Sequence, residues 1–182
     1  AWKWTRSNEP KKFNSRTCMK SIDLITQVRV GSTRLPGKAL LPFWDGKPML
    51  YYFLERLKRC QSIRYIVAAI PDSNENDALE KYCAEQGVQT FRGSEEDVLD
   101  RYYQAAKQFG SQSVIRVTSD CPLVDSASID LVARQAKDLW DDLDYAYNNL
   151  AQETYPHGFD CEWIRFELLE KIWKETTRPD HR

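Results

Sequence analysis

The stretch that most constrains the fold of this chain lies at residues 22–40. Residues 22–28 form an apolar run rich in β-branched side chains, which is typical of a strand buried in a parallel sheet. The chain then enters a loop that contains Gly31, Pro36 and Gly37. Open α/β sheets bind ligands at the carboxyl ends of their strands, commonly beside such a loop after the first strand. The stretch therefore predicts an open α/β sheet with a ligand site at this loop.

The side chains of this loop indicate what it binds. Three of them are cations, Arg29, Arg34 and Lys38, and two are hydroxyls, Ser32 and Thr33. Guanidinium forks, an ammonium and backbone N–H groups are the donors that hold a polyphosphate. We therefore predict a triphosphate-binding loop, with a solvated basic surface loop as the alternative.

Two common phosphate-binding motifs do not fit this loop. The Walker A motif, G-x-x-x-x-G-K-[ST], has a shorter gap between its glycines and a hydroxyl after its lysine. Here five residues separate Gly31 from Gly37, and Ala39 follows Lys38, so the hydroxyl that would hold magnesium is missing. A dinucleotide fingerprint is also excluded, because Gly31 has no partner glycine at the G-x-G-x-x-G spacing.

Composition narrows the class of protein further. A chain of 182 residues can bury a sizeable core as one domain, and a net charge of −1 supplies no basic field for a nucleic-acid partner. The five cysteines contain no C-x-x-C pair, which favours reduced thiols in the cytoplasm over a zinc site or a disulfide framework. No apolar run approaches the roughly 20 residues of a membrane span. Residues 1–20 are polar and aperiodic, so we expect a tail or linker before a domain at 21–182.

The remaining pattern alternates strands and helices. Helices of about ten residues between short apolar strands predict a mostly parallel α/β sheet. The expected strands lie at 22–28, 65–70, 88–91, 113–118, 144–148 and 162–164, and the expected helices at 48–59, 76–86, 94–109, 125–139 and 166–174.

The string R-x-G-S-T-R-L-P-G-K at 29–38 closely resembles the signature of sugar-activating cytidylyltransferases. The resemblance is to the spore coat polysaccharide biosynthesis F family in particular, and enzymes that make CMP-activated keto-sugar acids share a looser form of the string. It covers residues 22–182 and implies a three-layer α/β/α, Rossmann-like nucleotidyltransferase fold of the nucleotide-diphospho-sugar transferase type. Members of the family usually continue further, so the resemblance also implies that the domain is incomplete at its C-terminus.

Two carboxylates are candidate ligands for Mg²⁺. Asp120 follows the expected strand 113–118, where an acidic side chain faces the same crevice as the first loop, although it also suits a simple turn. The family has Gly-Asp-x-Pro-Leu here, and this chain has Ser119 in place of the glycine. The resemblance adds Asp160 as the second metal carboxylate. Because Mg²⁺ binds one or two carboxylates plus substrate phosphates, Asp120 and Asp160 would suffice.

The residues around 92–97 are candidates for the nucleotide base and sugar. Ser94 and Asp97 fit a capping box at the start of a helix, which is the structural interpretation. The resemblance adds that this turn lies against the nucleotide, which makes Arg92 and Ser94 candidate contacts, together with Ala69 at the end of the strand 65–70. The sequence does not decide between cytosine and uracil.

The resemblance implies transfer of CMP from CTP to a hydroxyl of a sugar or sugar acid, with release of pyrophosphate, for surface polysaccharide biosynthesis. Arg29, Lys38 and Asp120 are the expected catalytic residues: the cations offset charge on the leaving group, and Mg²⁺ polarises the α-phosphate. A homodimer is expected if the full C-terminal part is present. Two alternatives stay open: a glycosyltransferase with an Asp-x-Asp motif, for which residues 142–144 have the spacing, and a non-catalytic nucleotide-binding remnant.

Overall fold

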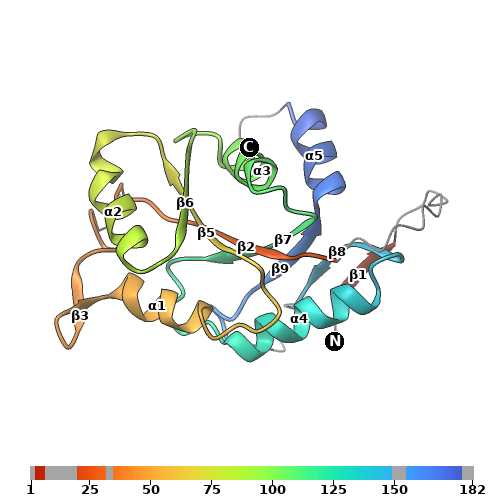
Figure 1. Ribbon diagram of the computed structural model, residues 1–182, viewed down its shortest axis with the longest axis horizontal. Coiled ribbons are helices and arrows are strands. Elements are labelled where there is room, and N and C mark those ends of the chain that lie inside the picture. The colour runs from red at the N-terminus through yellow and green to blue at the C-terminus, as the bar shows by residue number, and fades with distance from the viewer. Residues whose placement is uncertain (1–2, 7–19, 32–34, 149–154, 178–182) are drawn as a thin grey trace.

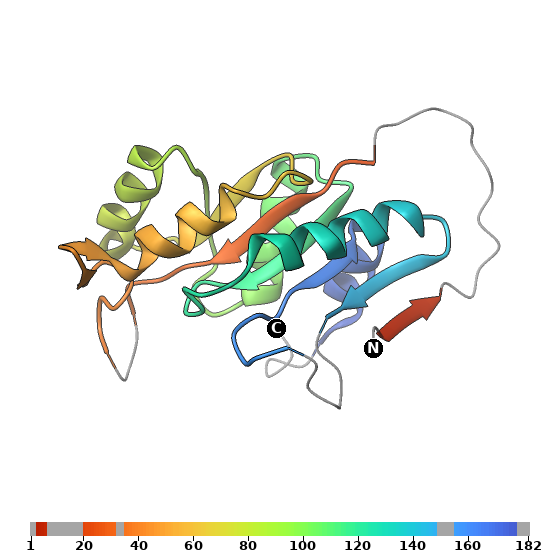
Figure 2. The same ribbon diagram turned by 90° about the horizontal axis from the view of Figure 1, so that it is seen from below.

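The computed structural model describes residues 3–6, 20–31, 35–148 and 155–177. Within them, one seven-stranded sheet has the order β1-β8-β9-β7-β2-β5-β6 (Figures 1 and 2). Strand β2 runs parallel to β5 and β7, and β9 runs antiparallel to both β7 and β8, so β8 has the direction of β7. The mostly parallel sheet is thus confirmed. The strands are β1 Lys3–Arg6, β2 Asp23–Gln27, β5 Ile66–Pro71, β6 Gln89–Gly93, β7 Ser113–Thr118, β8 Leu143–Tyr147 and β9 Glu162–Arg165.

Helices cover both faces of this sheet. The helices α1 (Met49–Leu57), α2 (Asp77–Glu85) and α4 (Ser126–Asp138) contribute their apolar sides to one core. The helices α3 (Val98–Gln108) and α5 (Phe166–Glu175) pack together on the opposite face and form a second core (Figure 1). The three-layer α/β/α architecture that the sequence predicted is therefore present.

Strand β2 carries apolar side chains that are buried on both faces of the sheet. Successive side chains of a strand point to opposite faces. Leu24 and Val28 belong to the core under α1, α2 and α4, whereas Ile25 belongs to the core under α3 and α5. All three are at most 1% exposed, so the strand buries apolar side chains on both of its faces.

Two short elements were not expected from the sequence. Lys3–Arg6 forms β1, which pairs antiparallel with β8 and covers what would otherwise be a free sheet edge, although residues 1–20 had been interpreted as a tail or linker. The strands β3 (Pro42–Trp44) and β4 (Lys47–Pro48) form a small hairpin after the signature loop. Asp45 and Gly46 join them with φ of 48° and 69°, as a tight hairpin turn requires.

The expected capping box of α3 is wrong. The helix begins at Val98, and its N-cap is Asp97, whose side chain accepts a hydrogen bond from the Asp100 N–H at 2.7 Å. Ser94 instead accepts from the Asp97 N–H at 3.0 Å, in the turn before the helix. Asp and Ser both make good N-caps, and spacing alone did not show which of them the helix uses.

No helix within the described residues is both long and apolar enough to cross a membrane.

Candidate active site

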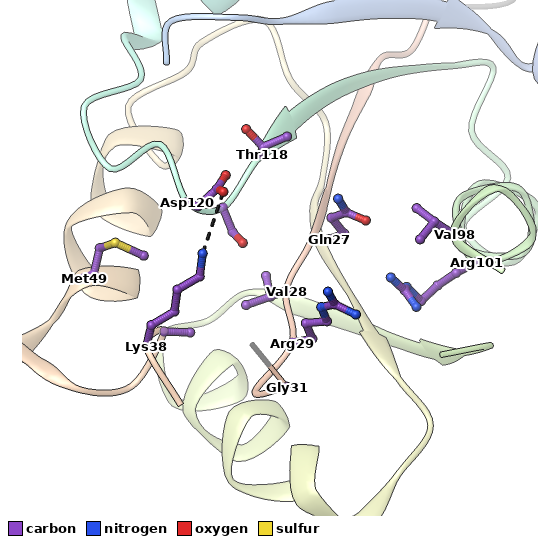
Figure 3. A pocket seen from close by; sticks show the side chains of 12 residues that line it. Gln27, Val28, Arg29, Gly31, Lys38, Met49, Val98, Arg101, Thr118 and Asp120 are labelled. Carbon is purple, nitrogen blue, oxygen red and sulfur yellow. Dashed lines mark ion pairs between the residues drawn. The ribbon is translucent and has the colours of Figure 1, made fainter. Parts of the chain in front are cut away.

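A cleft of about 290 Å³ opens at the carboxyl ends of β2 and β7 (Figure 3). The chain passes from β2 to β5 and β6 on one side and returns to β7 on the other, so the cleft lies where the strand order reverses. Ligands of open α/β sheets bind at this switch point. The lining residues are Gln27, Val28, Arg29, Gly31, Lys38, Ala39, Met49, Val98, Arg101, Thr118, Ser119 and Asp120.

The signature loop forms one wall of this cleft. Its two ends are joined at a neck, where the Gly37 N–H donates to the Val30 carbonyl at 2.9 Å. Gly37 has φ of 71°, a left-handed conformation that favours glycine. The neck returns the chain so that Lys38 lies in the cleft with Arg29 and Gly31. The other predicted phosphate-binding residues, Ser32, Thr33 and Arg34, lie outside the described residues.

Asp120 faces this wall from the end of β7. Its carboxylate lies 3.7 Å from the Lys38 ammonium, and the side chains of Lys38 and Asp120 are 33% and 54% exposed (Figure 3). An ion pair this exposed contributes little to stability, so the carboxylate can exchange its partner for a ligand at low cost. The structure thus brings together the cations Arg29 and Lys38 and the carboxylate Asp120 that the sequence singled out.

Asp160 lies in a neighbouring loop and does not line the cleft. It accepts hydrogen bonds from the Gly158 N–H at 3.3 Å and from the Tyr147 hydroxyl at 3.5 Å. Gly158 lies directly against Cys121, since a Cβ on this glycine would be 3.5 Å from the Cys121 sulfur. The two acidic loops are therefore in contact. Within the described part of the chain, no three His, Cys, Asp or Glu side chains gather as metal ligands, so a metal here would need substrate oxygens as well.

The three residues expected at the base and sugar are not among those that line the cleft. Arg92 donates hydrogen bonds to the Asp72, Asp77 and Glu80 carboxylates, and these bonds raise its pKa. Ala69 is buried, and its carbonyl accepts from the Val28 N–H at 3.2 Å. The Ser94 carbonyl accepts from the Arg101 guanidinium. Ala69 and Ser94 therefore support residues that form the walls of the cleft.

Asn76, which the sequence did not single out, fixes the start of the signature loop. It is fully buried in the short 3₁₀ helix η1 (Asn74–Asn76), and its side-chain oxygen accepts from the Val30 N–H at 3.0 Å. Its amide nitrogen donates to the Ser73 hydroxyl at 2.8 Å. An asparagine just before a helix looks like an ordinary cap, so no signal in the sequence revealed this role.

Asn76→Ala is expected to weaken CTP binding roughly 5-fold, because it removes the only acceptor that the described residues offer to the Val30 N–H, which costs about 1 kcal/mol. Asn74→Ala, at an exposed asparagine of the same 3₁₀ helix, serves as the control. Calorimetric titration with CTP measures both. Equal CTP affinity in the alanine variant and the wild-type protein would contradict a role in placing the loop.

The Asp-x-Asp spacing at residues 142–144 does not contribute to this cleft. Asp142 precedes β8 and Asp144 is its second residue. Since β8 runs in the direction of β7, these carboxylates lie at the amino end of the sheet, whereas Asp120 lies at the carboxyl end. Asp144 is also 3.8 Å from the Arg165 guanidinium. A glycosyltransferase site built on this motif would lie at the edge of the sheet opposite the cleft.

A cationic loop that faces a carboxylate across the switch point of a parallel sheet is an arrangement in which open α/β proteins bind phosphorylated ligands. Comparison with known families places the chain within that class. The cytidylyltransferase family model matches residues 24–175, and the chain belongs to this family. The family resemblance of the signature string is thereby confirmed.

Individual proteins similar to this chain are consistent with its membership in the cytidylyltransferase family. The chain is 38% identical over 156 residues to an uncharacterized protein of Methanocaldococcus jannaschii, covering 86% of this chain and 61% of that protein. It is 38% identical over 166 residues to the spore coat polysaccharide biosynthesis protein SpsF of Bacillus subtilis, covering 86% of this chain and 68% of SpsF. A cytidylyltransferase structure from Leptospira borgpetersenii has a TM-score of 0.84 at 36% identity, covering 91% of this chain and 68% of that one. The chain thus spans 61–68% of the length of these three proteins.

Proposed function

We propose that the protein transfers CMP from CTP to a hydroxyl of a sugar or sugar acid, with release of pyrophosphate, in the biosynthesis of a surface polysaccharide. The observation that carries the proposal is that Lys38, which belongs to the family's signature string, lies 3.7 Å from Asp120 in one cleft. Membership in the cytidylyltransferase family supports the reaction, and the name of SpsF supports a polysaccharide product.

In this reaction a sugar hydroxyl oxygen forms a bond to the α-phosphorus and releases its proton to solvent, while the bond from that phosphorus to the α–β bridging oxygen breaks. Negative charge develops on the departing pyrophosphate. Arg29 and Lys38 line the cleft as cations and would offset that charge, which is the effect by which fixed donors accelerate such steps. In this step they act as electrostatic partners of the phosphates.

We further propose that Mg²⁺ binds at Asp120, with Asp160 as the second carboxylate. The donor set fits: one exposed carboxylate in the cleft, a second in the adjoining loop, and room for phosphate oxygens. When bound, the ion would polarise the α-phosphate. Before it binds, Lys38 neutralises Asp120, and afterwards Lys38 would be released toward the phosphates.

A cytoplasmic location is also part of the proposal. Cys60, Cys83, Cys121 and Cys161 carry free thiols, and burial raises the pKa of Cys60 and Cys83 to about 12. Unreactive reduced thiols are usual in a reducing compartment. The homodimer that the family resemblance implies can be checked by light scattering on a chain that includes the C-terminal part of its relatives.

The first test is thermal unfolding with CTP, UTP, ATP and GTP, each with and without Mg²⁺. A ligand that binds only the folded state raises the free energy of unfolding, by about 2.7 kcal/mol at a concentration 100-fold above its Kd, and the unfolding midpoint rises with it. We expect the largest shift with CTP plus Mg²⁺. A larger shift with UTP would favour a uridylyl enzyme. Binding of CTP without turnover of any sugar would favour the non-catalytic remnant.

A further inference from the structure

Two arginines in the cleft have no acidic partner. Lys38 is paired with Asp120, but no ion pair within the described part of the chain reaches Arg29 or Arg101. Both arginines line the cleft, Arg29 from the end of β2 and Arg101 from α3 (Figure 3). Their guanidinium groups point toward one another in that view. The side of the cleft next to α3 therefore holds two arginines without a contacting carboxylate, although the charges of Glu95 and Asp97 act on Arg101 from farther away.

Arg101 is also buried, which is unusual for an arginine without a carboxylate. Only 1% of the residue is exposed. One terminal nitrogen donates to the carbonyls of Ser94 and Glu95, while the buried Nε has no hydrogen-bond partner. A buried donor without a partner costs about 1–3 kcal/mol. Stability alone does not account for a charged group in this position.

The positive charges of the two arginines act on each other. Burial lowers the pKa of Arg101, and the positive charge of Arg29 lowers it further. In a partly desolvated cleft, an anion between the two groups would interact strongly with both. The 11-residue helix α3 begins at Val98, which also lines the cleft, and the amino end of a helix favours negative charge as well.

The local chain holds the Arg101 stem in place. Gly93 ends β6, and a Cβ there would lie 2.7 Å from the Phe91 ring and 3.3 Å from the Arg101 Cγ. Any larger residue at 93 would push against the arginine. Together with the two carbonyls at Ser94 and Glu95, this contact fixes the guanidinium before a ligand arrives. A fixed donor loses little conformational entropy on binding.

We infer that Arg101 and Arg29 form an anion-binding pair that takes a phosphate group of the nucleoside triphosphate and of the pyrophosphate product. The pair lies across the cleft from Lys38 and Asp120, so the polyphosphate is held from two sides. This inference rests on the proposed function and adds to it a binding residue outside the signature loop. The turn at residues 94–95 is tied to the same guanidinium, so phosphate binding and the shape of this turn are coupled.

The inference is tested by the binding of inorganic pyrophosphate, measured by calorimetry on the full chain. We expect Arg101→Met to weaken pyrophosphate binding at least about 10-fold, since it removes a charge-assisted donor. Arg116→Met is the matched control: Arg116 is a partly buried arginine of β7 that has its own partner, Glu162, at 2.8 Å and does not line the cleft. The control should bind pyrophosphate as the wild-type protein does.

A second variant separates binding from folding. Arg101→Lys keeps the charge and a donor for the Ser94 carbonyl but loses the second arm of the guanidinium, so we expect a near-normal unfolding midpoint and roughly 5-fold weaker pyrophosphate binding. Wild-type affinity in the folded Arg101 variants would overturn the inference and leave the proposed function standing. Failure of the wild-type protein to bind either pyrophosphate or CTP would overturn both.

Discussion

Asp120→Asn is expected to reduce CMP transfer roughly 1000-fold, which corresponds to about 4 kcal/mol of transition-state stabilisation. Asparagine has nearly the shape of aspartate but no charge, so it would no longer attract Mg²⁺ to the cleft or neutralise Lys38. The fold should not change, because the carboxylate is 54% exposed and the 3.7 Å contact with Lys38 is the only ion pair that it forms within the described residues. Release of pyrophosphate from CTP, measured with a panel of sugar acceptors, gives the turnover.

A readout independent of turnover accompanies this variant. If Asp120 holds the metal, Mg²⁺ should add to the CTP-induced rise of the unfolding midpoint in the wild-type protein but not in Asp120→Asn. The control is Asp142→Asn, which removes an exposed carboxylate at the opposite edge of the sheet. Normal turnover in Asp120→Asn, or a loss confined to Asp142→Asn, would show that the metal assignment is wrong.

The sequence predicted the sheet well because its strands carry their own signal. The continuous apolar run at Ile66–Pro71 can be buried on both faces only inside a covered parallel sheet. It missed β1 and the hairpin of β3 and β4, whose short or polar sequences have no period. Pairing partners in the folded chain determine these strands, since β1 forms on the ladder of β8.

The residues of the candidate site likewise divide into those that the sequence predicted and those that it did not. Arg29, Lys38 and Asp120 were predictable, because a signature string and the carboxyl end of a strand place them without further information. Arg101 and Asn76 were not, because their importance depends on which distant backbone groups they reach. A signal for Arg101 did exist: it lies on the buried side of α3 between Val98 and Ala105, where a charged residue is unexpected.

The amino ends of the strands carry a polar network that is separate from the cleft. Asp23 is fully buried at the start of β2 and accepts two hydrogen bonds from the Arg64 guanidinium, at 2.9 and 2.6 Å. It also accepts from the Ser111 hydroxyl at 2.6 Å and the Tyr65 N–H at 3.2 Å. One carboxylate thus joins β2 to the segments that lead into β5 and β7.

Asp23→Ala is expected to lower the free energy of unfolding by about 3 kcal/mol, because it leaves Arg64, Ser111 and Tyr65 without their acceptor. The estimate lies at the low end for a buried pair, since the Arg64 side chain is 36% exposed and can turn to water. For a chain of 182 residues this corresponds to a fall of about 6–12 °C in the unfolding midpoint. Scanning calorimetry measures it directly.

The matched control for Asp23 is Glu55→Ala. Glu55 pairs with Lys58 at 2.8 Å, close to the 2.6 Å of the Asp23 pair, but its side chain is 39% exposed. An exposed pair contributes at most about 0.5 kcal/mol, so the two variants separate burial from distance. CTP affinity of the folded Asp23→Ala protein should stay normal, because Asp23 lies at the end of β2 remote from the cleft. Equal losses of stability in the two variants would mean that burial of the carboxylate does not determine its contribution.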